Sequence, residues 1–273
     1  MQKITSGERK KLRVPPAWTN VEICKNEKEK VHVRGVDSKG KYQYIYRQTW
    51  QERSSKKKFL RVKKLIKRLP YIKRIKRKTG KEKLICTIIK LLLCSYIRIG
   101  NDAYEKENKT YGLCTMKKNH CRIKDDGIYF NFIGKKGKLQ NIKLPLRKDI
   151  LKCLKSLRRI PGDYLFQYIE NGEIKKINAQ CVNQFICENI GNYTCKDFRT
   201  YGANKEMYNF LCSRQVPKTK TEVNKNLSEA LSYVSVKLGN SKTICRKSYI
   251  SPKIIEIYDV NKNMNRMKLI NII

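Results

Sequence analysis

The stretch L-I-C-T-I-I-K-L-L-L-C-S-Y-I-R-I-G-N, residues 84–101, is the most apolar part of this chain. Lys90 interrupts the apolar run, which is in any case too short to cross a bilayer. The pattern therefore predicts a buried core helix over residues 84–97, stopped near Gly100. The rest of the fold has to be built around this helix.

Arg98 follows the predicted core helix directly and has apolar neighbours, Ile97 and Ile99. A lone arginine is usually solvated, but a guanidinium confined by apolar side chains needs an anion. Glu82 is the one acidic residue in the preceding helix turns. A phosphate from a substrate is the better partner for Arg98.

The first fifth of the chain has the pattern of strands. Apolar and polar residues alternate at 31–33, tyrosines alternate through 42–46, and D-S-K-G-K (residues 37–41) supplies a turn. These features predict a small, twisted antiparallel sheet with a basic face.

The period changes to that of a helix near Trp50. Apolar residues recur three or four apart from 59 to 69, which predicts a basic amphipathic helix ended by Pro70. The polar, highly charged residues 48–58 are interpreted as a linker. We accordingly expect a β-rich domain over residues 1–52 and an α-rich domain over residues 53–273.

The remainder of the chain is predicted to be mainly helical, with one three-stranded sheet. A hairpin is expected over residues 122–133, with its turn at D-D-G, and a third strand around Ile142 and Leu144. Ser251 and Pro252 fit the cap and first residue of a last helix. The other expected helices cover residues 147–159, 178–190, 196–212 and 222–238. The predicted fold class is α+β.

The composition favours a polyanionic partner. The 273 residues include 63 Lys and Arg against 23 Asp and Glu, a formal net charge of +40. Lys, Ile, Asn and Tyr are all abundant, as an AT-rich coding sequence would produce, so not every lysine is a contact. Nucleic acid remains the predicted partner.

Cysteine and histidine usage argues against a metal site. The chain has 11 Cys without a C-x-x-C pair and only 2 His, so no zinc site is expected. Scattered cysteines in odd number suit reduced thiols, and no secretory segment opens the chain. We therefore expect a soluble intracellular protein, with no metal, no cofactor and no membrane contact.

Five side chains in order along the chain carry the chemistry. They are Arg98 in I-R-I-G-N, Lys135 in F-I-G-K-K-G-K, Arg199 in K-D-F-R-T-Y-G, Asn240 in L-G-N-S and Tyr249 in K-S-Y-I-S. Two guanidiniums can clamp a phosphate, an ammonium can give up a proton, and a phenol can attack phosphorus. This set could cut a nucleic-acid strand without a metal.

These motifs resemble those of type IB DNA topoisomerases of the poxviral and related viral-bacterial branch. The similarity includes V-P-P-A-W-T-N-V-E-I from Val14, D-S-K-G-K-Y-Q-Y-I-Y from Asp37 and Y-G-L-C-T-M-K-K-N-H from Tyr111. It continues through K-D-F-R-T-Y-G-A-N and ends at K-S-Y-I-S-P, so it covers nearly the whole chain in one order. The resemblance implies that residues 1–52 bind DNA, that residues 53–273 carry the catalytic site, and that the two domains form a C-shaped clamp around duplex DNA. It also implies a monomer, found in the virion and host cytoplasm if the protein is poxviral.

The resemblance also implies a role for each of the five side chains. Tyr249, nine residues after Asn240, matches the nucleophile that forms a 3′-phosphotyrosyl link, and Lys135 matches the general acid. Lys136 and Lys138 compete for that role, but the family places the acid directly after the first glycine.

The implied role of the remaining three is to stabilise the transition state. Arg98 and Arg199 match the two arginines that bind the phosphate. Asn240 departs from the family, which has histidine there. Its amide can donate a hydrogen bond without charge, although a simple turn role after Gly239 is nearly as well supported.

Further residues are predicted to contact DNA. Gln43, Tyr44 and Tyr46 match positions that touch bases and backbone in relatives, although strand tyrosines more often pack within a sheet. Lys117 and Lys118 match a segment that enters the major groove, the alternative being a solvated basic face.

Two other functions are alternatives to DNA relaxation without ATP or metal. A tyrosine recombinase should show H-x-x-R and a helical N-terminal domain, whereas this chain has K-x-x-R from Lys196 and a β pattern. A non-catalytic basic DNA-binding protein would explain the charge but not the ordered motifs.

Overall fold

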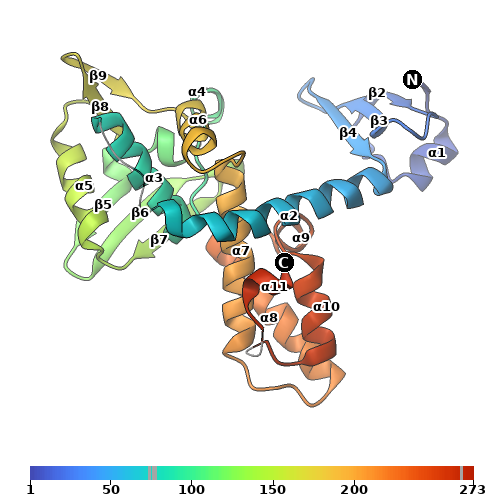
Figure 1. The fold of residues 1–273 in the computed structure, drawn as a ribbon. Coiled ribbons are helices and arrows are strands. Elements are labelled where there is room, and N and C mark those ends of the chain that lie inside the picture. The colour runs from blue at the N-terminus through green and yellow to red at the C-terminus, as the bar shows by residue number, and fades with distance from the viewer. Residues whose placement is uncertain (73–74, 76–78, 265–266) are drawn as a thin grey trace. The chain divides into compact units, whose positions relative to one another are not determined.

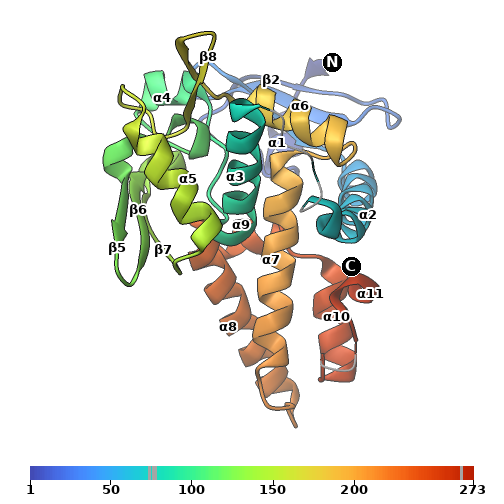
Figure 2. The same ribbon diagram turned by 60° about the vertical axis from the view of Figure 1, so that its left-hand side comes forward.

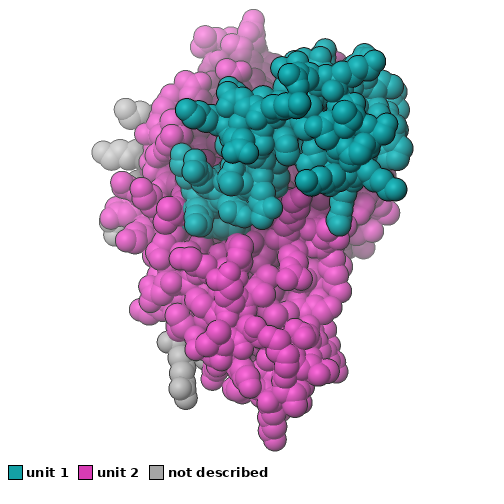
Figure 3. Space-filling model, turned by 90° about the vertical axis from the view of Figure 1, so that its right-hand side faces the viewer, with its two compact units in different colours: residues 1–59 teal, residues 60–273 magenta. Residues whose placement is uncertain are grey.

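The structure is a computed structural model that describes residues 1–72, 75, 79–264 and 267–273. The chain forms two compact units, Met1–Phe59 and Leu60–Ile273. Figure 1 shows the order of their elements and Figure 3 distinguishes the units by colour. The expected division at residue 52 stays a prediction.

The first unit is built on a four-stranded antiparallel sheet. Its order is β1-β2-β3-β4, with the strands at Gln2–Lys3, Thr19–Ile23, Val31–Val36 and Tyr42–Tyr46, and helix α1 spans Ser6–Lys11. Its small core contains Val14, Val21, Ile23 and Val33. Alternation along β2 and β3 puts Val21, Ile23 and Val33 on one face of the sheet, and Val14 packs against them from the segment before β2.

The turn before β4 is fixed by local hydrogen bonds. Asp37 accepts from the backbone N–H groups of Lys39 at 2.9 Å and Lys41 at 3.0 Å, and Gly40 adopts a φ of 72°. Glycine enters this left-handed region at little cost. The expected D-S-K-G-K turn is thus confirmed.

Helix α2 covers Gln48–Ile72, so the segment expected to be a linker is helical. Its Lys, Arg, Glu and Gln residues are good helix formers, and their polar groups can stay in water. The linker interpretation relied on the high charge of the segment and left this helix propensity out. Pro70 lies inside the last turn, and the helix ends two residues later. The break was therefore placed slightly too early.

The second unit contains the expected three-stranded sheet. Strands β5 (Cys121–Lys124), β6 (Gly127–Ile133) and β7 (Leu139–Leu144) pair antiparallel in this order. A two-stranded sheet, β8 (Gln167–Glu170) with β9 (Glu173–Lys176), was not predicted. Its short strands are joined by N-G, a hairpin signal that the sequence reading passed over.

Helix α3 (Gly80–Ser95) is the centre of this unit. It packs against α5 (Lys148–Arg159), α6 (Ala179–Asn189), α7 (Cys195–Cys212) and both sheets, through β7 and β8. Figure 2 shows α3 and α7 side by side. Leu84, Ile88 and Leu91 are fully or almost fully buried. The prediction of a core helix is confirmed.

The C-terminal part of the second unit is helical. Helix α8 covers Lys220–Leu238, α9 Lys242–Ser248, α10 Pro252–Asn261 and α11 Leu269–Ile272. Ser251 and Pro252 begin α10 as predicted. Four short helices, α1, α4 (Asp102–Asn108), α9 and α11, were not predicted, because one or two helical turns give little periodicity. In the described part of the chain no helix is long and apolar enough to span a bilayer.

Candidate active site

The backbone reverses direction where α3 ends, and this places Arg98. Tyr96 closes the helix in the left-handed region with a φ of 55°, which is unfavourable for a residue with a Cβ. Its hydroxyl donates to Glu206 at 2.8 Å, and a Cβ on Gly202 of α7 would collide with its ring. The tyrosine is thus locked against α7, and its carbonyl is turned toward Arg199.

Arg199 projects from α7 into the protein interior and is 4% exposed. Its two terminal nitrogens donate to the carbonyls of Tyr96 and Leu238. Burial, followed by the charge of Arg98, lowers the pKa of Arg199 to about 10. Among the described residues no carboxylate hydrogen-bonds to Arg199, so its charge is available to an anion.

Arg98 donates a hydrogen bond to the side-chain oxygen of Asn240. Asn240 lies just beyond the C-terminus of α8, where Gly239 adopts a φ of 58°. Because the amide oxygen faces Arg98, the amide nitrogen is the group left to bind something else. That nitrogen is buried and has no partner.

Tyr249 closes α9 and lies beside the same guanidinium. Arg199 Cζ is 5.5 Å from the centre of its ring. Burial raises the pKa of Tyr249, but nearby positive charges outweigh burial and leave the pKa below its usual value. Arg199 contributes most to this lowering, followed by Arg98. The surroundings therefore favour the phenolate, the nucleophilic form.

Arg98, Arg199, Asn240 and Tyr249, here called the Tyr249 cluster, are thus brought together from four separate segments. Among the described residues three buried side-chain nitrogens lack a hydrogen-bond partner, and two of them, Arg199 Nε and Asn240 Nδ2, belong to this cluster. Buried unpaired donors are costly, about 1–3 kcal/mol each. Two in one cationic cluster indicate a site for an anion.

Asn204 was not predicted from the sequence, although it holds the backbone at Tyr249. It is fully buried in α7, donates to the carbonyl of Tyr249 at 2.8 Å and accepts from the N–H of Ser251 at 2.8 Å. Asparagine is unfavourable inside a helix, and that misfit within K-D-F-R-T-Y-G-A-N could have drawn attention to it.

Lys135 lies in the turn between β6 and β7, and its side chain is exposed. The turn, residues 134–138, is closed by a hydrogen bond from Gly134 N–H to the Lys138 carbonyl at 2.8 Å, and Lys136 has a φ of 64°. The structure thus presents Lys135 on a hairpin tip, outside the Tyr249 cluster.

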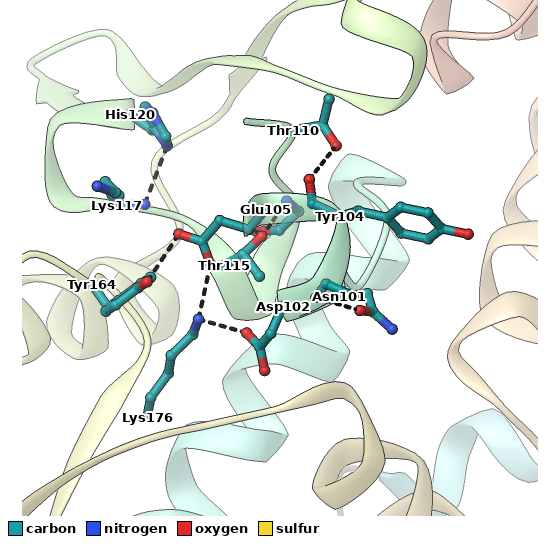
Figure 4. A network of polar contacts seen from close by, with 12 residues as sticks. Asn101, Asp102, Tyr104, Glu105, Thr110, Thr115, Lys117, His120, Tyr164 and Lys176 are labelled. Carbon is teal, nitrogen blue, oxygen red and sulfur yellow. Dashed lines mark hydrogen bonds and ion pairs between the residues drawn. The ribbon is translucent and has the colours of Figure 1, made fainter. Parts of the chain in front are cut away.

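Lys117 lies next to a polar network shown in Figure 4, and Lys118 follows it in the chain. Lys176 contacts Asp102 at 2.6 Å and Glu105 at 3.0 Å, and Tyr164 donates to Glu105 at 2.9 Å.

The network extends to the backbone of Lys117, which, with Lys118, was predicted to contact DNA. Lys117 pairs with Tyr164 through an isolated β-bridge, and its N–H donates to His120 Nδ1 at 3.2 Å (Figure 4). The Lys118 ammonium donates to the Ile160 carbonyl. The segment is therefore held by its own unit, and DNA contact there stays a prediction.

Gln43, Tyr44 and Tyr46 belong to β4 of the first unit. Tyr46 stacks on Trp50 with ring centres 4.7 Å apart, and Tyr44 is 44% exposed. The Gln43 amide donates to Asp37 at 2.8 Å. Tyr44 and Tyr46 lie on one strand face, which offers aromatic surface, while contact with bases remains a prediction.

Comparison with known proteins agrees with the chemistry that the Tyr249 cluster indicates. Residues 47–270 match the family model described as the catalytic core of eukaryotic DNA topoisomerase I. DNA topoisomerase 1B of Acanthamoeba polyphaga mimivirus is 32% identical over 267 residues, which cover 92% of this chain and 79% of that protein. DNA topoisomerase 1B of Vaccinia virus (strain Copenhagen) is 27% identical over 259 residues, 90% of this chain and 79% of the relative.

The chain belongs to the type IB DNA topoisomerase family, as the motifs indicated. Among solved structures, the XerH site-specific recombinase bound to palindromic difH has 16% sequence identity and a TM-score of 0.44. That match covers 67% of this chain and 47% of the recombinase.

Proposed function

We propose that this chain is an enzyme that relaxes supercoiled duplex DNA through a transient cut in one strand. The observation that carries the proposal is the pair of buried, unpartnered donors, Arg199 Nε and Asn240 Nδ2, beside a tyrosine of lowered pKa. A scissile phosphate would satisfy both donors and place its phosphorus near the phenol.

In the cutting step the Tyr249 phenol releases its proton to water, and its oxygen attacks the phosphorus of a phosphodiester. A tyrosine–phosphate bond forms at the 3′ end as the bond from phosphorus to the 5′ oxygen breaks. Lys135 transfers its proton to that departing oxygen. Arg98, Arg199 and Asn240 donate to the non-bridging oxygens, whose charge grows in the transition state.

Resealing is the reverse reaction. The broken strand rotates about its intact partner, and the 5′ hydroxyl then attacks the phosphotyrosine while Lys135 takes back the proton. The covalent link conserves the energy of the original bond. We therefore infer that neither ATP nor a metal ion is needed, and that one chain suffices because it carries all five side chains.

The proposed DNA partner agrees with the net charge of +40. Phosphate contacts release counterions, so the logarithm of the affinity should fall linearly with the logarithm of salt concentration. Gln43, Tyr44, Tyr46, Lys117 and Lys118 are proposed contacts.

The decisive experiment is plasmid relaxation in EDTA without ATP. We expect stepwise relaxation and, after denaturation, a DNA adduct that mass spectrometry maps to Tyr249. Exchange of strands between two duplexes would instead support a recombinase. DNA binding with neither relaxation nor adduct would leave only the non-catalytic alternative.

A further inference from the structure

The side chain of Gln140 in β7 lies between two glycines that each precede a residue of the proposed site. Gly134 comes directly before Lys135, and Gly239 comes directly before Asn240. Gln140 is half-buried, and its aliphatic part and its amide contact different glycines. One side chain thus joins the exposed hairpin tip to the C-terminus of α8.

The contacts are close enough to require glycine on both sides. A Cβ placed on Gly134 would lie 2.9 Å from Gln140 Cγ. A Cβ placed on Gly239 would lie 2.7 Å from the amide nitrogen of Gln140 and closer still to its oxygen. Gly239 also needs its left-handed φ of 58°, whereas Gly134 has extended backbone that any residue can adopt. At Gly134 the need for glycine is therefore steric.

We propose that Gln140 is a positioning residue that holds the Lys135 turn against the C-terminus of α8, so that the ammonium reaches the leaving oxygen. This inference rests on the proposed function, because it assumes that Lys135 is the acid. Lys135 is exposed and cannot be held by packing of its own side chain. The base of its turn can be held, and Gln140 supplies that contact.

The test uses a change of leaving group. Replacing the bridging 5′ oxygen by sulfur gives a thiolate leaving group, which departs without a general acid because thiols have a pKa of roughly 8.5. Single-turnover cleavage is measured for both substrates. Gln140→Ala should slow the oxygen substrate about tenfold, since small displacements of catalytic groups are costly, and the sulfur substrate less than about twofold.

Two further variants keep the result interpretable. Gln140→Met preserves chain length without the amide and should show a smaller split between the substrates. Asn141→Ala changes the exposed neighbour in β7 and should show none. Equal slowing of both substrates by Gln140→Ala and Gln140→Met, or no slowing by either, would overturn the inference.

The parent reaction is checked separately. Lys135→Ala should show the same split, and more strongly. If Lys135→Ala splits the substrates but Gln140→Ala does not, the inference about Gln140 fails while the proposed function stands. If Lys135→Ala slows both substrates equally, the acid role of Lys135 fails, and the inference about Gln140 fails with it.

Steric coupling supplies an independent readout. Gly134→Ala should slow cleavage of the oxygen substrate because its Cβ pushes Gln140 away, and the effect should shrink in the Gln140→Ala background, where that side chain is gone. Fully additive effects would contradict the contact.

Discussion

The Tyr249 cluster and the Lys135 turn are held in opposite ways. Arg199 is 4% exposed, hydrogen-bonds to two carbonyls and is fixed by α3, α7 and the end of α8. Lys135 is exposed on a five-residue hairpin tip, residues 134–138. The proposed phosphate-binding side of the site is therefore preorganised, whereas the proposed acid, Lys135, has freedom to move.

This difference suits the two tasks. Donors that stabilise developing charge act best when fixed in advance, since reorganisation is then not part of the barrier. A proton donor must reach the leaving oxygen and later take the proton back, which an ammonium on a flexible stem can do. Fixing the Tyr249 cluster in advance costs folding stability, because its two buried donors have no hydrogen-bond partner among the described residues.

The strongest test of the preorganised side removes the nucleophile. Tyr249→Phe should reduce relaxation and the covalent adduct below detection, because the phenol oxygen forms the bond to phosphorus. Duplex affinity should change less than about twofold, since the hydroxyl is a small part of a binding surface dominated by phosphate contacts.

Gel relaxation, adduct trapping and a binding titration check this together. Tyr233→Phe is a matched control, because Tyr233 is a partly exposed tyrosine of α8 outside the cluster. An adduct that persists in Tyr249→Phe would move the nucleophile elsewhere.

The next largest effect tests the mobile side. Lys135→Ala should slow single-turnover cleavage by about 10²–10⁴-fold, the usual contribution of a general acid. Lys136→Ala is the control, because Lys136 occupies the same exposed turn. A larger loss in Lys136→Ala would assign the acid to Lys136 instead.

A smaller effect is expected at Asn240. Asn240→Ala should lower the cleavage rate about tenfold, less than the 10²-fold or more typical of an isolated oxyanion donor, because two arginines share the load. Asn240→His should keep or raise the rate. A pH dependence near neutrality should appear only in the histidine variant, since an amide does not titrate.

Rates measured from pH 5.5 to 8.5 distinguish these cases. Cleavage by Asn240→Ala at the parental rate would reduce Asn240 to a turn residue. The buried, unpaired amide nitrogen of Asn240 favours a lowered cleavage rate in Asn240→Ala.

The sequence was sufficient where the pattern is local. The apolar run at residues 84–97 predicted α3, alternation predicted β4, and D-D-G marked the turn between β5 and β6. The ordered motifs also named the family, and the comparisons confirmed it.

Long-range contacts could not be read in this way. Arg98 and Asn240 are 142 positions apart, and nothing local indicates that they share a hydrogen bond. The same holds for the long-range contacts of Asn204, Tyr96 and Gln140. The sequence around each of these residues gives no sign of its contact partners. The helical conformation of residues 48–58 was not predicted, because their charge was read without regard to the helix propensity of Lys, Arg, Glu and Gln.

The smallest predicted effect concerns the scaffold that keeps α3 in place. Asp149 at the start of α5 pairs with Lys90 of α3 at 2.6 Å, and the hydrogen bond from Lys90 holds the pKa of Asp149 down at about 2. A carboxyl with a lowered pKa stabilises the fold above its unfolded pKa and loses that contribution as pH falls toward the folded value. Asp149→Asn should therefore cost stability at pH 6, by under about 1 kcal/mol because Asp149 is 40% exposed, and the difference should shrink between pH 4 and pH 2. Urea unfolding at pH 6, 4 and 3 measures it, with the exposed turn residue changed in Asp125→Asn as the control. A difference that stays constant down to pH 3 would mean that the ion pair contributes nothing to the anchoring of α3.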